Sequence, residues 1–232
     1  MARGTQFLQI VMMLRDELGR SNDVSVGVDD LPALKQTINR VYSSLYDEYD
    51  WPHLRSVFPK QTLYSGQRYY DLPATLNYDR IERVAVWYGG IPHPLPRGID
   101  FDEYASFDSN SDVRSEPALR WDVRWTGSAE QLEIWPIPNS NQQSLQIIGV
   151  NKIPKLVNDI DVCLLDDMLV VLFAAAELLQ RQKSGDAEAK LKQAQARFNR
   201  FKARVSNDTM VRLGMGDGRQ SINSGRATVR VR

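Results

Sequence analysis

The stretch GQRYYDLP, from Gly66 to Pro73, gives the first indication of the fold. A glycine favours a turn, the tyrosine pair favours a strand, and a proline after such a run ends it. Because successive side chains of a strand point to opposite faces, Tyr69 and Tyr70 are predicted to face opposite sides of a sheet. The stretch therefore predicts a hairpin turn at Gly66 and Gln67 that leads into a short strand.

A β-rich segment surrounds this stretch, from about residue 62 to residue 150. Short runs rich in β-branched and aromatic residues alternate there with Gly, Pro, Asn and Asp. The predicted strands are KQTLY (60–64), RYYDL (68–72), RIERVAVWYG (80–89), ALRWDVRW (118–125), EQLEIWPI (130–137) and SLQIIGV (144–150), and a helical turn is predicted in GIDFDEYASFD (98–108). Strands of this length and spacing predict a small antiparallel sandwich or rolled sheet.

Two helices are predicted before the β-rich segment. Apolar residues at steps of three and four from Phe7 to Leu18 indicate the first helix, with Thr5 as its N-cap and Gly19 as its stop. The second helix, LPALKQTINRVYSSLYDEYDW (31–51), carries a proline in its first turn, where proline is tolerated, and ends at Pro52.

Two further helices are predicted after the β-rich segment. The run LLDDMLVVLFAAAELLQRQ (164–182) is apolar almost all round, which indicates the central helix of a core. Gly185 separates it from DAEAKLKQAQARFNRFKARV (186–205), which begins with acids and ends with bases, as the helix dipole favours.

These elements predict an α+β fold in which one helical domain carries one β domain. The N- and C-terminal helices form a four-helix core, a small antiparallel β domain is inserted between them, and an extended C-terminal tail follows. The predicted boundaries are 1–61 for the N-terminal helices, 62–151 for the β domain, 152–208 for the C-terminal helices and 209–232 for the tail.

The charge of the chain is unevenly distributed. The 29 basic and 29 acidic residues cancel, but residues 181–232 hold 13 basic and 4 acidic residues, so residues 1–180 carry a net charge of −9. This asymmetry predicts either a contact surface for an acidic partner or a solvated basic helix followed by a tail. The composition, 42% hydrophobic and 25% charged, is that of a globular protein with a substantial core.

The cysteine count and the apolar runs indicate the cellular compartment of the protein. Cys163 is the single cysteine, which excludes an internal disulfide, and its apolar context predicts a buried small hydrophobe that suits a reducing cytoplasm. The N-terminus shows no signal-peptide cleavage pattern, and the apolar run Met168–Ala176 falls far short of the roughly 20 residues that a bilayer span requires. No membrane partner is predicted.

The sequence predicts no catalytic, metal or cofactor site. His53 and His93 have no cysteine or second histidine at ligand spacing, and there is no GxSxG motif and no phosphate-binding glycine loop. The acid pair Asp166–Asp167 could imitate paired catalytic carboxylates, but a solvated helix surface or a helix N-terminus explains it more simply. We therefore expect the protein not to be an enzyme.

Aromatic residues leave two binding functions open. Trp121 and Trp125, four apart in a predicted strand, share a face and could form a carbohydrate- or surface-binding platform, although a sandwich core is favoured. The run RFNRFKARV (197–205) interleaves bases and aromatics as DNA-binding surfaces do, but its phenylalanines fall on the packed side of the helix.

The residues from Thr209 to Arg232 contain 5 arginines, one aspartate and four glycines, with no core pattern. Such a composition predicts disorder in the free chain. The end, SINSGRATVRVR, alternates small apolar residues with arginines, as do peptides that add a strand or dock in a groove. Fully extended, the segment reaches up to roughly 80 Å. It could bridge to another subunit, or it could have no role.

The order of these elements resembles that of the head-to-tail connector, or adaptor, proteins of tailed bacteriophages, in the group that includes tail tubular protein A. The resemblance covers about residues 5–205. It is carried by LPALKQTINRVYSSLYDEYDW (31–51), LYSGQRYYDLPATLNYDRIERVAVWYGG (63–90), LEIWPIPNSNQQSLQIIGV (132–150) and MLVVLFAAAELL (168–179), followed by the Ala- and Lys-rich last helix.

The resemblance implies a structural virion protein at the head–tail interface, assembled in the host cytoplasm. Such adaptors form a ring of identical subunits, usually twelve, that docks on the portal protein, extends the DNA channel and supports tail or nozzle proteins. The resemblance also implies that the C-terminal segment contacts the portal protein. It further implies that the β domain contacts neighbouring subunits or tail proteins. The candidate portal-binding residues are Arg219, Ile222, Arg226, Val229, Arg230, Val231 and Arg232, and the candidate interface residues are Tyr69, Tyr70, Arg97 and Phe101.

Overall fold

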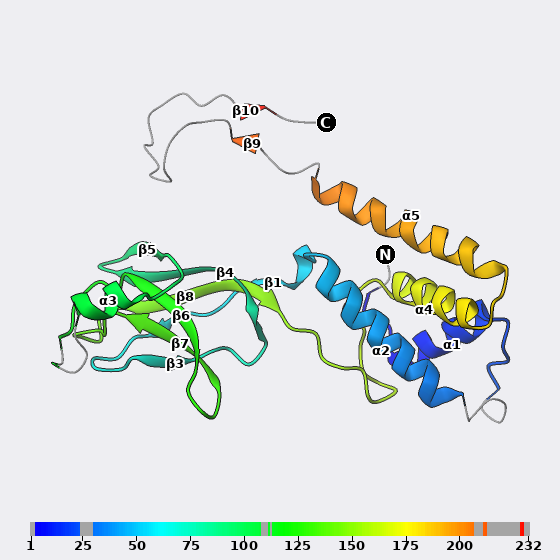
Figure 1. The fold of residues 1–232 in the computed structure, drawn as a ribbon, viewed down its shortest axis with the longest axis horizontal. Helices are drawn as coiled ribbons and strands as arrows, with labels where there is room; N and C mark the ends of the chain where they lie inside the picture. The colour runs from blue at the N-terminus through cyan, green and yellow to red at the C-terminus, as the bar shows by residue number, and fades with distance from the viewer. Residues whose placement is uncertain are drawn as a thin grey trace. The chain divides into compact units, whose positions relative to one another are not determined.

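The computed structural model describes residues 3–23, 30–107, 111 and 113–206, together with the short strands β9 (Val211–Arg212) and β10 (Thr228–Val229). The chain divides into two compact units (Figure 1). The helical unit consists of Met1–Tyr49 and Lys155–Arg232, and the β unit is Asp50–Pro154. Helices and antiparallel sheets are thus segregated along the chain, and the predicted α+β class is confirmed.

The helical unit is built around α4. Its helices are α1 (Phe7–Glu17), α2 (Leu31–Glu48), α4 (Asp167–Arg181) and α5 (Asp186–Ser206). Helix α4 packs against the other three, and its Ala174–Ala176 run is buried, because short side chains let neighbouring helices approach closely. The prediction of a central, almost wholly apolar helix is therefore confirmed.

The start of α1 differs from the prediction. The N-cap position is Gln6, whose side chain makes no capping hydrogen bond, and Thr5 is not the cap. The Thr5 hydroxyl instead donates to Asp167 Oδ2 at 2.7 Å, and the Cys163 N–H donates to the Thr5 carbonyl at 3.0 Å. The hydroxyl that was predicted to cap the helix therefore binds Asp167, a residue distant in the sequence. Gly19 ends the helix as predicted, with a φ of +65° that a glycine adopts freely.

The acid pair at the start of α4 is buried. Asp166 is the N-cap and accepts a hydrogen bond from the Leu169 N–H at 2.9 Å, so the interpretation as a helix N-terminus is confirmed and that as a solvated surface is wrong. Arg197 of α5 pairs with both carboxylate oxygens of Asp166, at 2.7 and 2.8 Å. Cys163, next to this site, is buried as predicted, and burial raises the pKa of its thiol to about 12.

The β unit is a sandwich of two antiparallel sheets, as predicted. One sheet has the order β1-β8-β4-β5, with β2 also paired to β8, and the other has the order β3-β7-β6. The strands are β1 (Arg55–Val57), β2 (Gln61–Thr62), β3 (Tyr69–Asp71), β4 (Leu76–Tyr88), β5 (Ile91–Leu95), β6 (Arg120–Trp125), β7 (Glu130–Trp135) and β8 (Ser144–Asn151). Apolar side chains of both sheets form one core between them, including Leu63, Tyr70, Val84, Trp121, Leu132 and Leu145.

Two features of the strands differ from the sequence analysis. Strands β2 and β3 belong to different sheets, so the turn that contains Gly66 does not close a hairpin but carries the chain from one sheet to the other. Strand β5 is not among the predicted strands, and it contains prolines at 92 and 94. These prolines are tolerated because β5 is an edge strand, where a residue without an N–H loses no ladder bond.

The boundaries of the β unit also lie further out than the predicted 62 and 151. Helix α2 ends at Glu48, and after the short 3₁₀ helix η1 (Pro52–Leu54) the chain enters β1 at Arg55. Because β1 and β2 pair with β8, residues 55–62 are part of the sheet. Strand β1 shows no periodic pattern in the sequence, because it is only three residues long.

A candidate interaction face on the β unit

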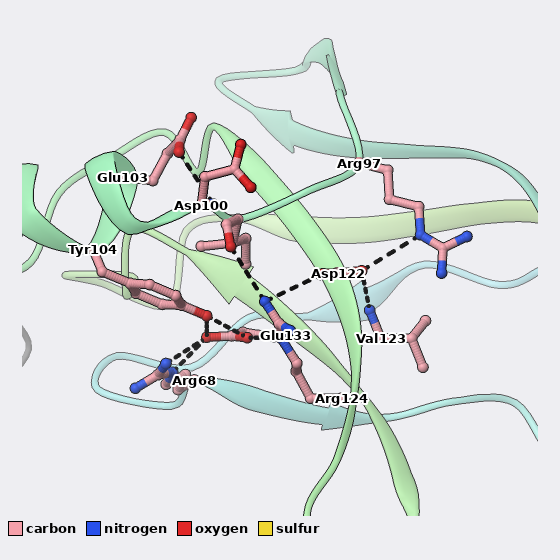
Figure 2. A network of polar contacts seen from close by, with 10 residues as sticks. Arg68, Arg97, Asp100, Glu103, Tyr104, Asp122, Val123, Arg124 and Glu133 are labelled. Atoms are coloured by element: carbon pink, nitrogen blue, oxygen red, sulfur yellow. Dashed lines mark hydrogen bonds and ion pairs between the residues drawn. The ribbon is translucent and has the colours of Figure 1, made fainter.

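The outer face of the three-stranded sheet is centred on Glu133 of β7. Along β7 the side chains alternate: Leu132 and Ile134 enter the core, whereas Glu133 and Trp135 point to the other side. Glu133 is nevertheless 0% exposed, because the short helix α3 (Phe101–Ser106) and two arginines cover it (Figure 2). The sequence therefore places a full negative charge in a buried position on this face.

Four side chains form the Glu133 network: Arg68, Tyr104, Arg124 and Glu133. Arg68 Nε donates to Glu133 Oε1 at 2.7 Å, Arg124 Nε donates to Oε2 at 3.1 Å, and the Tyr104 hydroxyl lies 2.8 and 2.9 Å from the two oxygens (Figure 2). Both carboxylate oxygens are thus satisfied, two of the bonds being charge-assisted, as a buried carboxylate requires.

The pKa values of the partners follow from this arrangement. Burial by itself lowers the pKa of Arg68, but the hydrogen bond and the charge of Glu133 outweigh burial, so that the pKa lies above its ordinary value. Burial and the neighbouring Glu133 carboxylate both raise the pKa of Tyr104, which therefore keeps its proton and remains a donor. Arg68 and Tyr104 therefore both remain hydrogen-bond donors to the Glu133 carboxylate near neutral pH.

The network and its neighbours hold α3 against the sheet. Trp135 Nε1 donates to the Glu103 carbonyl at 2.8 Å, and the Trp135 ring packs edge-on against Tyr104. Asp100 and Glu103 form a capping box at the start of α3, and Arg120 of β6 pairs with Glu103 at 3.2 Å. A helix of six residues is too short to be stable alone, so these contacts determine its position.

Tyr69 and Tyr70, two of the candidate interface residues, lie on opposite faces of β3. Tyr69 is half-buried on the outer face, where the Arg68 guanidinium lies 5.2 Å from its ring. Tyr70 is completely buried in the sandwich core, and its hydroxyl donates to the carbonyls of Tyr64 and Gln67. The prediction of opposite faces is confirmed, but Tyr70 as an interface residue is corrected, because its side chain does not reach the surface.

The other two interface candidates lie on the same side of the β unit as the network. Arg97 pairs with Asp122 at 3.4 Å, and its guanidinium lies 5.4 Å above the Trp121 ring. Phe101, on α3, is 82% exposed. Trp125, which the sequence analysis paired with Trp121, is 69% exposed; it shares a face with buried Trp121 but stands at the last position of β6.

The tryptophans do not form a binding platform. Trp51, Trp121 and Trp135 are buried, Trp87 is half-buried against Gln146, and Trp125 alone among the five is exposed. A carbohydrate platform needs several exposed rings together, so the interpretation of Trp121 and Trp125 as core is confirmed for Trp121 only. In α5 the Phe198 ring packs edge-on against Tyr49 and Phe173, so this aromatic is not part of a DNA-binding surface.

The candidate portal-binding residues fall in the C-terminal segment. Arg219, Ile222, Arg226, Arg230, Val231 and Arg232 lie outside the described residues. Val229 lies in β10, whose backbone pairs antiparallel with β9 at Val211. Their role stays a prediction. Within the described ranges we find no group of acidic, histidine and cysteine side chains that could hold a metal ion, and no helix suited to crossing a bilayer.

The fold defines an α+β protein with a helical unit split by an inserted β sandwich. The model of the SU10 adaptor protein family matches residues 5–227 of the chain. The chain therefore belongs to this family, which is a family of phage head-to-tail adaptors, and the resemblance inferred from sequence is confirmed. No curated protein matches the chain.

Proposed function

We propose that the chain assembles with identical subunits into a ring, twelve in number, that docks on the portal protein of the phage head. In this proposal the ring extends the channel through which genomic DNA passes and offers a platform to tail or nozzle proteins, and the chain catalyses no reaction. The observation that carries the proposal is the family match, since one continuous block, residues 5–227, includes both units.

The geometry of the β unit supports contacts between subunits on the face around the Glu133 network. A ring needs a heterologous contact, in which one surface of each subunit meets a different surface of the next. A rigid face that carries exposed aromatics meets the usual requirements, because aromatic side chains bury much area with little loss of entropy. Phe101 supplies an exposed aromatic on this face, and the network keeps α3 in a fixed position.

Electron microscopy combined with mass measurement tests the proposal. The purified chain is imaged alone and after mixing with the portal ring of the same phage, and we expect rings, or portal rings capped by a second ring. A monodisperse monomer that does not bind the portal would overturn it. Phe101→Ser should lower the ring yield several-fold without unfolding the chain, whereas Ile91→Ser, which removes another exposed apolar side chain of the β unit, should not.

A further inference from the structure

The helical unit carries a cluster of exposed apolar side chains, which we call the Ile160 patch. It consists of Leu8 and Met12 on α1 and of Val157, Ile160 and Val162 in the segment before α4; Ile160 is the most exposed of them, at 73%. Backbone hydrogen bonds join the two segments. The Phe7 N–H donates to the Asp161 carbonyl at 2.8 Å. The Leu8 N–H donates to the Asp159 carbonyl at 3.1 Å. Exposed apolar side chains that gather in this way mark a contact site for another protein.

Hydrogen bonds hold the segment that carries Ile160 in one conformation. The Asn39 side chain of α2 donates to the Leu156 carbonyl at 2.8 Å and accepts from the Leu156 N–H at 2.9 Å. The Asp161 carboxylate accepts from the N–H groups of Val157 and Asn158, at 2.6 and 2.7 Å. Because the segment is already ordered in the single subunit, a partner that binds it loses little conformational entropy.

The same unit has an open apolar groove in a different place. The groove lies between α2, α4 and α5 and encloses about 600 Å³. Its apolar lining consists of Val41, Leu45, Phe173, Ala176, Ala187 and Leu191, none of which belongs to the Ile160 patch. One subunit therefore carries both an exposed apolar patch and an apolar recess, as a heterologous contact between identical subunits requires.

The two surfaces carry opposite charges. Around the groove, four cations pair with three glutamates: Arg40 and Arg181 share Glu177, Lys192 pairs with Glu188, and Lys202 pairs with Glu48. These ion pairs therefore contain one cation in excess. At the Ile160 patch, Lys35 pairs with Asp159 at 2.6 Å, whereas Asp161 has no cationic partner in the part of the chain that the structure describes. Charges at the edge of a contact contribute orientation more than affinity, and these favour the patch against the groove over either surface against itself.

We propose that the Ile160 patch of one subunit occupies the groove of a second copy of the chain, with the Ile160 side chain between α2 and α5. This contact depends on the proposed ring, in which it joins the helical units of neighbouring subunits. Pockets of roughly 300–1,000 Å³ enclose drug-sized ligands, so the groove has room for several aliphatic side chains. Because each subunit carries one patch and one groove, the same contact repeats from subunit to subunit.

Disulfide trapping between two full-length chains tests the proposal. One chain carries Ile160→Cys and the other Leu191→Cys, the two are co-expressed with different affinity tags, and Cys163, which is buried, does not compete. Under mild oxidation we expect a crosslink between the two chains at least about tenfold faster than in the matched control, in which Ile91→Cys replaces Ile160→Cys. Ile91 is similarly exposed, at 61%, but lies on the β unit.

A second measurement needs no cysteine. Ile160→Ser should lower the yield of rings several-fold, whereas Val57→Ser, which changes an exposed apolar side chain of the β unit, should leave the yield unchanged. Both residues are at the surface, so neither change removes a core contact.

The outcomes separate this contact from the ring itself. Rings that form with equal crosslinking of the Ile160 and Ile91 variants would overturn the contact and leave the ring standing. Crosslinks of the Ile160→Cys chain to itself, as fast as to Leu191→Cys, would overturn it in favour of patch against patch. The expected crosslink without closed rings would support the contact and refute the ring, and a parent chain that forms neither would overturn both.

Discussion

At the scale of single residues, Glu133 determines how firmly α3 is held. Its carboxylate is 0% exposed and lies between two guanidinium groups, while the Tyr104 hydroxyl connects it to the helix. A buried charge of this kind stabilises only while its partners stay in place, since removing one partner leaves the others unpaired. The polar network therefore links the position of Phe101 at the surface to the sheet beneath.

We predict that Glu133→Gln destabilises the β unit by about 1–3 kcal/mol. The amide keeps the volume but leaves Arg68 without its negative partner and Arg124 with Asp122 alone. The loss is limited because these arginines are 28% and 42% exposed. Urea unfolding followed by tryptophan fluorescence measures the change. Glu130→Gln, at the exposed end of the same strand, is the control and should remain within about 0.5 kcal/mol of the parent protein. Equal effects of the two changes would contradict the role given to the Glu133 charge.

At the scale of secondary-structure elements, the pair Arg197–Asp166 joins α5 to the start of α4. Asp166 serves both helices, because its Oδ1 caps α4 through the Leu169 N–H and both of its oxygens accept from Arg197. The hydrogen bond with Asp166 raises the pKa of Arg197 more than burial lowers it, so the Arg197 guanidinium stays charged over the whole physiological range.

We predict that Arg197→Met destabilises the helical unit by about 2–4 kcal/mol, because it leaves the buried Asp166 carboxylate without its cation. Amide hydrogen exchange should rise in α5 and at the start of α4, while β4 and β8 keep their protection. Lys192→Met is the matched control on the same helix; its partner Glu188 is exposed, and we expect a change below about 0.5 kcal/mol. Similar exchange in both variants would refute the special role of Arg197.

Periodicity predicted the long elements but not the contacts between them. The four helices of the helical unit and the core strands carried clear apolar spacing, whereas β1 has three residues and β5 contains two prolines. The role of Thr5 depended on Asp167, which is 162 positions away in the sequence. In the same way, nothing local marks Glu133 as buried: EQLEIW reads as an ordinary strand, and only tertiary contacts bring Arg68 and Tyr104 to it.

At the scale of the whole molecule, much of the charge asymmetry seen in the sequence is neutralised inside the helical unit. Cations of α5 pair with acids of three other segments: Lys190 with Glu17, Arg197 with Asp166, and Lys202 with Glu48. The basic helix is therefore not simply a surface for an acidic partner. The residues from Thr209 onward, with 5 arginines and one aspartate, hold the positive charge that remains for contacts with other chains.

We predict that deleting Thr209–Arg232 leaves both units folded and weakens attachment to the portal at least about tenfold. Folding should persist because the hydrophobic cores described in both units lie within residues 7–198. The deletion removes a net charge of +4, so the attachment that is lost should also be the part most sensitive to salt. Circular dichroism checks the fold, and co-sedimentation with portal rings at low and high salt measures attachment.

Replacing the 5 arginines by lysine is the control, since it keeps the charge. Attachment that survives the deletion undiminished would refute this role of the C-terminal segment, whereas loss in the lysine variant as well would assign the contact to guanidinium geometry and not to charge alone.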